Sequence, residues 1–411
     1  MPEFLRLEPP QEALSTWISA IPKKDISSEE IKTSDSLGRT ISKDIHSNEN
    51  MPSFTRSTVD GYAVIASDTH GASETLPIYI HVVGEVFMGM EPKFDLKPGE
   101  AALIHTGGML PKSANAVVMV EYTQIPHDDE VEIFKAVALG ENLINVGEDI
   151  AIGDQVFQAG QIIRPAEIGG LLALGKITVP VVKKPRIGII SSGDEVIDPQ
   201  LTPKLGQVRD INSYSLSALI TQYGGIPERV GIAPDNLEQL ETIVQDAYER
   251  YDAVIVTAGS SASTRDYTSR VIDKLGYPGV LVHGVNVRPG KPTILAVCDG
   301  KPVVGLPGNP ISSLVIAWLF VVPMIKFLKG DQRLFYKTTF EADLSINVAS
   351  SSGREEWIPV KIIENDPVPL AEPIFYKSNL VFSLSKADGL MVIPATANGI
   401  NAGERIQVYT L

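Results

Sequence analysis

A proline-stiffened turn in the second half of the chain carries two cations. Arg288 and Lys291 flank Pro289-Gly290. Guanidinium and ammonium groups held on a rigid turn suit phosphate or another tetrahedral oxyanion, although a solvated charged turn has the same composition. The turn therefore predicts an anion site that needs support from other residues.

A second turn combines two glycines with two prolines. It runs from Gly305 to Pro310 and includes Pro307, Gly308 and Asn309. Asn309 suits the N-cap of a helix whose first residue is Pro310, and the positive end of such a helix points at the turn. We expect an anion to bind here, with a tight turn needed only for packing as the alternative.

Two smaller turns lie beside apolar runs of strand length. They are Ser260-Ser261 and Asp210-Ile211-Asn212. Backbone N–H groups in such turns can line an oxyanion, and a purely structural turn is the alternative. We include Ser260, Ser261, Asp210 and Asn212 among the candidate binding residues.

Five carboxylates occupy predicted strand ends or helix starts: Asp194, Glu195, Asp210, Asp235 and Asp266. Any one of them alone is more often a helix cap than a catalyst. Five near one sheet edge, mixed with Lys and Arg, resemble a site for Mg²⁺ and phosphate. Because Mg²⁺ takes one or two carboxylates together with phosphate oxygens, not all five need to bind metal.

Several common signatures are absent from the sequence. Gly290-Lys291 is followed by Pro292, so there is no Walker A motif, and no G-x-G-x-x-G follows a strand. G-x-S-x-G is missing, and the six histidines show no metal-ligand spacing. The chemistry is therefore assigned neither to a standard nucleotide fold nor to a serine hydrolase.

The elements that must position these turns alternate between strand and helix. Apolar runs at 187–190, 228–232, 253–257, 293–297 and 302–305 alternate with helical patterns at 213–223, 236–250, 266–275 and from 310 onward. This order predicts a doubly wound, mostly parallel sheet with helices on both faces. In such a sheet the turns gather at the carboxyl ends of the strands, where ligands bind.

The flanking regions are richer in strands. Short β runs at 77–83, 101–105, 116–121 and 130–134 predict a small β domain, and 336–411 predicts a small barrel. We divide the chain into a discontinuous N-terminal body (1–55 and 145–184), an inserted β domain (56–144), an α/β domain (185–330) and a C-terminal barrel (331–411).

Composition limits the setting in which the protein works. The formal charge of −15 over 411 residues argues against a nucleic-acid surface. The single cysteine, Cys298, fits a reducing cytoplasm, and no signal peptide is expected. The apolar stretch Leu314–Ile325, which we expect Pro323 to break, is too short to span a membrane and predicts a buried helix or a subunit contact.

The combination of motifs resembles the MoeA family of molybdenum-insertion proteins, which includes the E domain of gephyrin. The resemblance runs over essentially the whole chain. It is carried by Ser57-Thr58-Val59-Asp60-Gly61-Tyr62-Ala63, Gly147-Glu148-Asp149, Arg164-Pro165-Ala166-Glu167-Ile168-Gly169, Ser192-Gly193-Asp194-Glu195, Pro289-Gly290-Lys291-Pro292, Gly305-Leu306-Pro307-Gly308-Asn309-Pro310 and Gly353-Arg354.

The resemblance implies an activity and a fold. Family members insert molybdate into molybdopterin, using adenylylated molybdopterin and Mg²⁺ and releasing AMP. The implied fold has an elongated body, an inserted β domain, a MogA-like α/β domain and a C-terminal β barrel. It also implies a homodimer whose clefts are shared between subunits, with molybdopterin adenylyltransferase and apo-molybdoenzymes as partners and neither nucleic acid nor membrane.

The resemblance also implies residue roles. Asp60, Glu195, Asp235, Asp266 and Lys291 match residues linked to activity, and Arg354 resembles a cleft arginine from the barrel. The expected metal ligands are Asp149, Glu195 and Asp266. The expected binding residues are Ser260, Ser261, Asp210, Asn212, Arg288, Pro307, Gly308, Asn309, Pro310 and Arg354. We expect Asp60 to reach the cleft from the partner subunit.

The sequence departs from the family pattern at the loop after 257. Ala258 and Ser263 replace glycines, Arg265 adds a cation beside Asp266, and Ile144 stands where an arginine is common. A low-activity cofactor-binding or scaffold paralogue and a tungstate-specific inserter are therefore alternatives to the molybdenumtransferase. An adenylyltransferase acting one step earlier is a further alternative.

Overall fold

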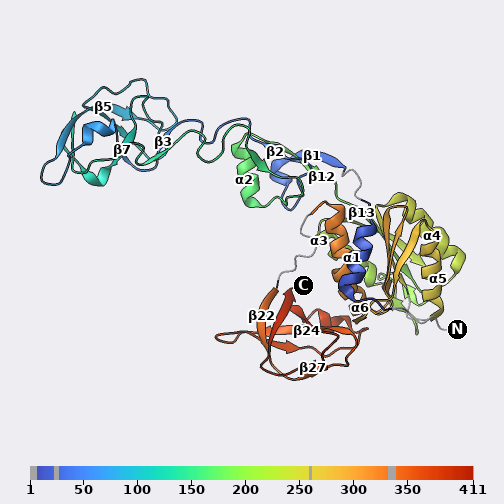
Figure 1. Ribbon diagram of the computed structural model, residues 1–411. Coiled ribbons are helices and arrows are strands. Elements are labelled where there is room, and N and C mark those ends of the chain that lie inside the picture. The colour runs from blue at the N-terminus through green and yellow to red at the C-terminus, as the bar shows by residue number, and fades with distance from the viewer. Residues whose placement is uncertain (1–6, 23–26, 259–261, 332–338, 411) are drawn as a thin grey trace. The chain divides into compact units, whose positions relative to one another are not determined.

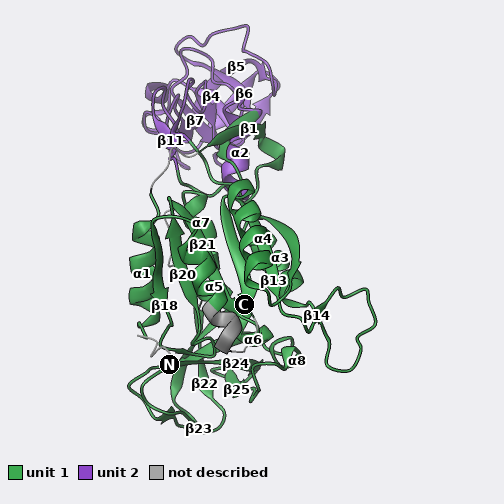
Figure 2. Ribbon diagram, turned by 90° about the vertical axis from the view of Figure 1, so that its right-hand side faces the viewer, with its two compact units in different colours: residues 1–42, 160–164, 178–411 green, residues 43–159, 165–177 purple. Residues whose placement is uncertain are grey.

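The chain folds into two compact units, shown in green and purple in Figure 2. The structure is a computed structural model that describes residues 7–22, 27–258, 262–331 and 339–410, with backbone only for 262–266. The first unit comprises Met1–Ser42, Gly160–Arg164 and Thr178–Leu411, and the second comprises Lys43–Ala159 and Pro165–Ile177. The finer boundaries expected at 55 and 145 stay a prediction.

A six-stranded sheet forms the centre of the first unit (Figure 1). Its order is β16 (Ile226–Ala233), β13 (Arg186–Ser192), β17 (Ala253–Ala258), β21 (Lys301–Pro307), β20 (Ile294–Cys298) and β18 (Pro278–His283). The first four strands are parallel, and β20 and β18 add antiparallel pairs at one edge. The prediction of a mostly parallel sheet is confirmed, although β18 was not expected.

Helices cover both faces of this sheet and divide its core in two. One apolar cluster includes residues of α3 (Asn212–Gln222) and α6 (Pro310–Ile316), and the other includes residues of α4 (Leu237–Arg250) and α5 (Ala262–Asp273). Asn236 caps α4, because its side chain accepts from the Gln239 N–H at 3.1 Å. Cover on both faces explains why every residue of β17 is buried.

Helix α1 (Pro10–Ala20) belongs to the same α/β layer, although the expected boundaries grouped it with the N-terminal body. The indole Nε1 of Trp17 donates to the Ala296 carbonyl of β20 at 2.8 Å. Ala13, Leu14, Trp17 and Ile18 are buried in the first apolar cluster. Burial of this apolar stripe places α1 on the sheet.

Pro323 does not break the apolar helix, which corrects the expectation from sequence. Helix α6 continues through η4 (Ala317–Val321), a turn of π-helix, into α7 (Val322–Leu328). A wider turn just before proline accommodates its ring and missing N–H. Pro310–Leu328 is long and apolar enough to cross a membrane, but 78% of its most apolar window is buried inside the protein, as in a core helix.

A closed five-stranded barrel follows the α/β layer. Its strands are β24 (Glu355–Ile363), β25 (Leu370–Pro373), β22 (Thr339–Leu344), β28 (Arg405–Thr410) and β26 (Gly389–Ile393), which pairs again with β24. The short strand β19 (Val287–Arg288), from the α/β layer, pairs with β24. Trp318 of η4 meets Trp357 of β24 edge-on at 5.5 Å between ring centroids. The barrel is therefore packed directly against the α/β layer.

A strand pair in the first unit, and one helix and a second six-stranded sheet in the second unit, lie outside the α/β layer and the barrel. In the first unit, β1 (Ser28–Lys32) pairs with β12 (Thr178–Val182). The second unit contains helix α2 (Pro165–Ala173), and Gly175 after it adopts the left-handed conformation common at helix ends. Its main sheet has the order β7 (Ala116–Met119), β4 (Gly61–Val64), β6 (Glu100–Ile104), β5 (Ile78–Val86), β9 (Glu130–Ile133) and β8 (Thr123–His127).

Candidate functional site

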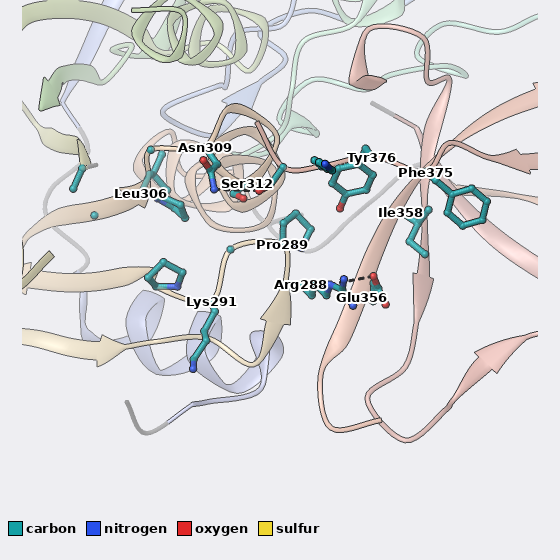
Figure 3. Close-up of a pocket in the computed structure, with 18 of the residues that line it drawn as sticks. Arg288, Pro289, Lys291, Leu306, Asn309, Ser312, Glu356, Ile358, Phe375 and Tyr376 are labelled. Carbon is teal, nitrogen blue, oxygen red and sulfur yellow. Dashed lines mark hydrogen bonds and ion pairs between the residues drawn. The ribbon is translucent and has the colours of Figure 1, made fainter. Parts of the chain in front are cut away.

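A cavity of about 700 Å³ opens at the carboxyl edge of the α/β sheet (Figure 3). One wall is built from the end of β17, the 305–309 turn and the 288–292 turn. The opposite wall is built from barrel residues of β24 and of segment 374–378. The two turns expected to hold an anion therefore meet at one cavity, as the parallel sheet predicted.

The 305–310 turn is held by partners on both sides. The Asn212 side chain donates to the Gly308 carbonyl at 2.7 Å, and the Asn309 side chain donates to Ser378 Oγ at 3.1 Å. Asn309 occupies the N-cap position of α6, but its side chain makes no capping bond. The Ile311 N–H instead donates to the Ser378 carbonyl at 3.1 Å, so a barrel residue satisfies one of the free N–H groups at this helix N-terminus.

The two cations of the 288–291 turn point in different directions. Arg288 forms an ion pair with Glu356 of β24, with Nε and Oε1 3.4 Å apart. Lys291 is exposed and extends away from Asn309 in Figure 3, and its side chain makes no hydrogen bond or ion pair with any described residue. The two charges are thus available to an anion to different degrees, because Arg288 must share its charge with a carboxylate.

Gly290 holds this turn close to the core. Its φ is +112°, and a Cβ built there would lie 2.3 Å from Cγ1 of Ile316. Thr293 Oγ1 also donates to the Gly290 carbonyl at 2.6 Å. Both the backbone conformation and the close approach to α6 therefore require glycine.

The barrel wall contains functional candidates that sequence reasoning missed. Phe375, Tyr376, Lys377 and Ser378 all line the cavity. Tyr376 Oη donates to the Trp357 carbonyl at 3.0 Å, and burial, followed by the charge of Glu356, raises the pKa of its phenol. The segment carries no motif, and only closure of the barrel brings it opposite the glycine turns.

The predicted carboxylates at the ends of β13 and β16 form a cluster beside the cavity. The Asp235 N–H donates to Asp194 Oδ1 at 3.1 Å, and Ser192 Oγ donates to Asp235 Oδ1 at 3.4 Å. Burial, then the charges of Asp194 and Glu195, raise the pKa of Asp235. None of these acids lines the cavity, and β13 is two strands from β21, or about 10 Å.

Asp210 has a structural position. It is buried, and its carboxylate accepts from Ser191 Oγ at 2.8 Å, Ser213 Oγ at 2.6 Å and the Ser213 N–H at 3.1 Å. These bonds place Asp210 at the start of α3 as a cap, which was the structural alternative for each of these acids. Asn212 acts on the cavity only by holding Gly308.

Other predicted residues lie outside this geometry. Asp60 and Asp149 belong to the second unit. Ser260 and Ser261 lie outside the described residues, and Asp266 is described only as backbone in the first turns of α5. Arg354 is exposed just before β24 and is not among the cavity residues.

Asp60 has a well-defined environment within the second unit. Its Oδ1 accepts from the Thr106 N–H at 2.8 Å and from Thr106 Oγ1 at 3.1 Å, which lowers the pKa of the carboxyl. His105 Nδ1 lies 3.9 Å from the same oxygen, and His105 Nε2 lies 2.9 Å from Glu85 Oε1. The carboxylate is therefore held ionised and oriented.

A ready-made metal centre is not seen in the described part of the chain. No group of three or more His, Cys, Asp or Glu side chains there is arranged to hold a metal ion. Burial is the largest cause of the raised pKa of Asp235, and the negative charges of Asp194 and Glu195 raise it further. These neighbouring carboxylates fit Mg²⁺, which needs only one or two of them when phosphate oxygens complete its shell.

Three family models together match most of the chain. They are the MoeA N-terminal region (domain I and II) over residues 8–175, the "probable molybdopterin binding domain" over 188–326 and the MoeA C-terminal region (domain IV) over 341–411. A molybdopterin biosynthesis protein of Methanocaldococcus jannaschii is 36% identical, over 93% of this chain and 92% of that protein. The chain belongs to the MoeA family.

Further relatives agree with this assignment. The molybdopterin molybdenumtransferases of Nostoc and Bacillus subtilis are 32% and 30% identical, over 91% and 95% of this chain and 86% and 91% of theirs. A crystal structure of the MoeA protein from Pyrococcus horikoshii OT3 matches with a TM-score of 0.83 at 30% identity, covering 99% of this chain and 100% of that one. The MoeA fold expected from the motifs, with its MogA-like domain and barrel, is confirmed, and this MoeA-family chain is an enzyme of molybdenum cofactor biosynthesis.

The loop departures have a structural context in this MoeA-family chain. Ala258 ends strand β17 and is not among the described residues with positive φ, and the backbone of Ser263 lies inside α5. Strand and helix conformations accept any residue, so neither position needs the conformational freedom of glycine.

Proposed function

We propose that the chain transfers molybdenum from molybdate into molybdopterin, consuming adenylylated molybdopterin and releasing AMP. The observation that carries this proposal is the 700 Å³ cavity, in which the 288–292 and 305–309 turns of a MoeA-family chain face the barrel. Its volume lies in the range of small-molecule sites. Backbone N–H groups, Lys291 and Lys377 would bind phosphate or molybdate oxygens.

Each wall has a separate task in this proposal. The turn at Gly308 and Asn309, held by Asn212 and Ser378, orients the substrate at the positive end of α6. Lys291 stabilises negative charge as the phosphoanhydride is attacked. Tyr376 keeps its proton and can donate only while its bond to Trp357 is released. Phe375, whose side chain is exposed, offers an apolar surface to the pterin ring.

Glu195 and Asp235 would hold Mg²⁺ together with substrate phosphates. When bound, Mg²⁺ supplies charge neutralisation at the phosphates. Asp266 and Asp149 are proposed as further ligands on the family resemblance. Arg354 is proposed to reach the cleft from the barrel, and Ser260 and Ser261 are proposed to line the nucleotide.

The same proposal includes a homodimer that works in the cytoplasm. Asp60 lies in the second unit and is held ionised, so it can serve a cleft completed by a partner subunit. A molybdopterin adenylyltransferase would supply the substrate, and apo-molybdoenzymes would accept the product. The buried, single Cys298 is compatible with a reducing compartment.

The test follows AMP release from adenylylated molybdopterin in the presence of Mg²⁺ and molybdate. We expect AMP formation to require the oxyanion, and Lys291→Ala and Glu195→Ala to lower the rate by about tenfold or more, the scale of a lost electrostatic stabiliser. Lys183→Ala, an exposed lysine outside the cavity, is the control for charge. Parental rates in both site variants would refute the assignment.

Tungstate in place of molybdate separates the metal-specific alternatives in the same assay. A scaffold paralogue would bind adenylylated molybdopterin and release no AMP with either oxyanion. The ordinary backbone at Ala258 supports the active enzyme over this second candidate. Formation of adenylylated molybdopterin from ATP would instead identify the earlier step.

A further inference from the structure

A second cavity, of about 360 Å³, lies at the opposite edge of the same α/β sheet. The C-terminal ends of α3 and α7 form one side, and segment 37–40 together with the end of β12 forms the other. After α3, Tyr223 and Gly224-Gly225 lead into β16. The cavity therefore lies at the amino edge of the strands, away from the candidate active site.

Basic side chains dominate the lining of this cavity, although the protein as a whole is acidic. The cavity is lined by Arg39, Lys184, Lys326 and Lys329, with Asp331 as the only acidic side chain among its lining residues. The chain as a whole carries a formal charge of −15. We call the cavity that these four cations line the basic cavity.

Lys329 is the most deeply placed of the four. It is 9% exposed, and its Nζ donates to the Tyr223 carbonyl at the end of α3, at 2.9 Å. Burial lowers the pKa of Lys329, and Lys326, Arg39 and Lys184 lower it further, against the opposing effect of Asp331. The folded protein thus holds positive charges close enough to repel one another.

A purely structural explanation accounts for only part of this charge. Each helix C-terminus carries about half a negative charge, which Lys329 offsets at α3. Arg39 is paired with Glu29 at 2.6 Å and donates to the Val182 carbonyl at 2.8 Å. Lys326 and Asp331 have contacts of their own. Lys184, however, makes no hydrogen bond or ion pair with any described residue, so its charge is left over.

We propose that the basic cavity binds a tetrahedral oxyanion, either a free inorganic ion or the phosphate group of a nucleotide. Lys184 and Lys329 provide charge-assisted donors from the two sides of the cavity. A volume of 360 Å³ exceeds what one phosphate group needs and lies at the lower end of ligand sites. An anion bound there relieves the repulsion among the four cations and ties segment 37–40 and the end of β12 to the helix ends.

The test is titration calorimetry on the full-length protein with inorganic phosphate, molybdate and AMP in separate arms. Lys291→Ala serves as the background, so that binding at the candidate active site is weakened. We expect Lys184→Ala to reduce phosphate affinity about fivefold or more, the scale of one unit charge at about 4 Å in water. Lys184→Arg should retain binding, because it keeps the charge.

The neighbouring lysine gives a matched control. Lys183 is exposed and lies one residue away, but it does not line the cavity. Lys183→Ala should leave phosphate affinity unchanged. Equal weakening by Lys183→Ala and Lys184→Ala would show only a general surface-charge effect and would overturn the proposal.

The three arms identify the source of the anion. Tighter binding of AMP than of phosphate would identify a nucleotide, and equal binding of phosphate and molybdate would identify a free oxyanion. A crystal soaked with molybdate should show an anomalous peak between Lys184 and Lys329. Absence of that peak, together with no phosphate binding in the Lys291→Ala protein, would refute the site.

Discussion

The two edges of one sheet handle charge in opposite ways. At the carboxyl edge, helix starts and glycine turns present N–H groups, one cation is shared with Glu356, and carboxylates cluster alongside. At the amino edge, helix ends present carbonyl groups, and four basic side chains face them. At the carboxyl edge, backbone N–H groups can supply much of the positive potential. At the amino edge, the positive potential must come from side chains.

The largest expected effect is at the carboxyl edge, where the backbone itself is the binding element. Gly290→Ala should destabilise the protein by about 2–4 kcal/mol, because the new Cβ would meet Ile316 and φ is positive. Chemical denaturation measures the change. Gly353→Ala is the matched control, since Gly353 has φ +103° but nothing within 4 Å of the built Cβ. Equal losses in the two variants would mean that the contact with Ile316 is unimportant.

A smaller effect concerns the excess acid at the same edge. The raised pKa of Asp235 means that the folded state holds this proton more tightly than the unfolded chain. Stability therefore falls as pH rises from about 4 through the folded pKa. Asp235→Asn should gain at most about 1 kcal/mol at pH 7, after allowance for solvent screening, and nothing at pH 3.

Thermal unfolding of the parent and the Asp235→Asn variant at the two pH values checks the sign of this effect. Asp366→Asn, in an exposed barrel loop, controls for the change in net charge. Addition of Mg²⁺ should stabilise the parent and not the variant. A variant that is less stable than the parent at pH 7 would contradict the argument from excess charge.

The smallest effect separates the helix cap from the contact across the cavity. Asn309→Ala removes the bond to Ser378 Oγ but leaves the Ile311 N–H bonded to the Ser378 carbonyl. We expect a loss of about 0.5 kcal/mol, as for one ordinary hydrogen bond, and not the larger loss of an N-cap. Ser378→Ala removes the same bond from the other side, so the two losses should be similar and the double variant should lose no more than one of them.

Sequence reasoning worked best where local chemistry decides the structure. The helical pattern at 236–250 marked α4, Pro310 marked the start of α6, and the apolar run before Ala258 marked a buried strand. These signals depend on near neighbours in the chain. They also brought the 288–292 and 305–310 turns correctly to one edge.

Long-range contacts account for what the sequence could not predict. Arg288 looked available for an anion because its partner, Glu356, is distant in the chain and reaches it only through the β19–β24 pairing. Asp210 looked like a ligand and instead turned inward to two serines. Tyr376 and Ser378 carry no local signal, since the closure of the barrel decides where they lie.

The pairing of β19 with β24 has a consequence for how this protein can be divided. Val287 and Arg288 lie in the α/β layer by chain position but are hydrogen-bonded to the barrel at Glu355 and Glu356. The group of strands that supports the cavity therefore does not divide at the expected domain boundary near 331. A chimera that exchanged the C-terminal domain alone between homologues would pair β24 of one homologue with β19 of the other. A chimera that also exchanged residues 286–292 would keep the native β19–β24 pair together.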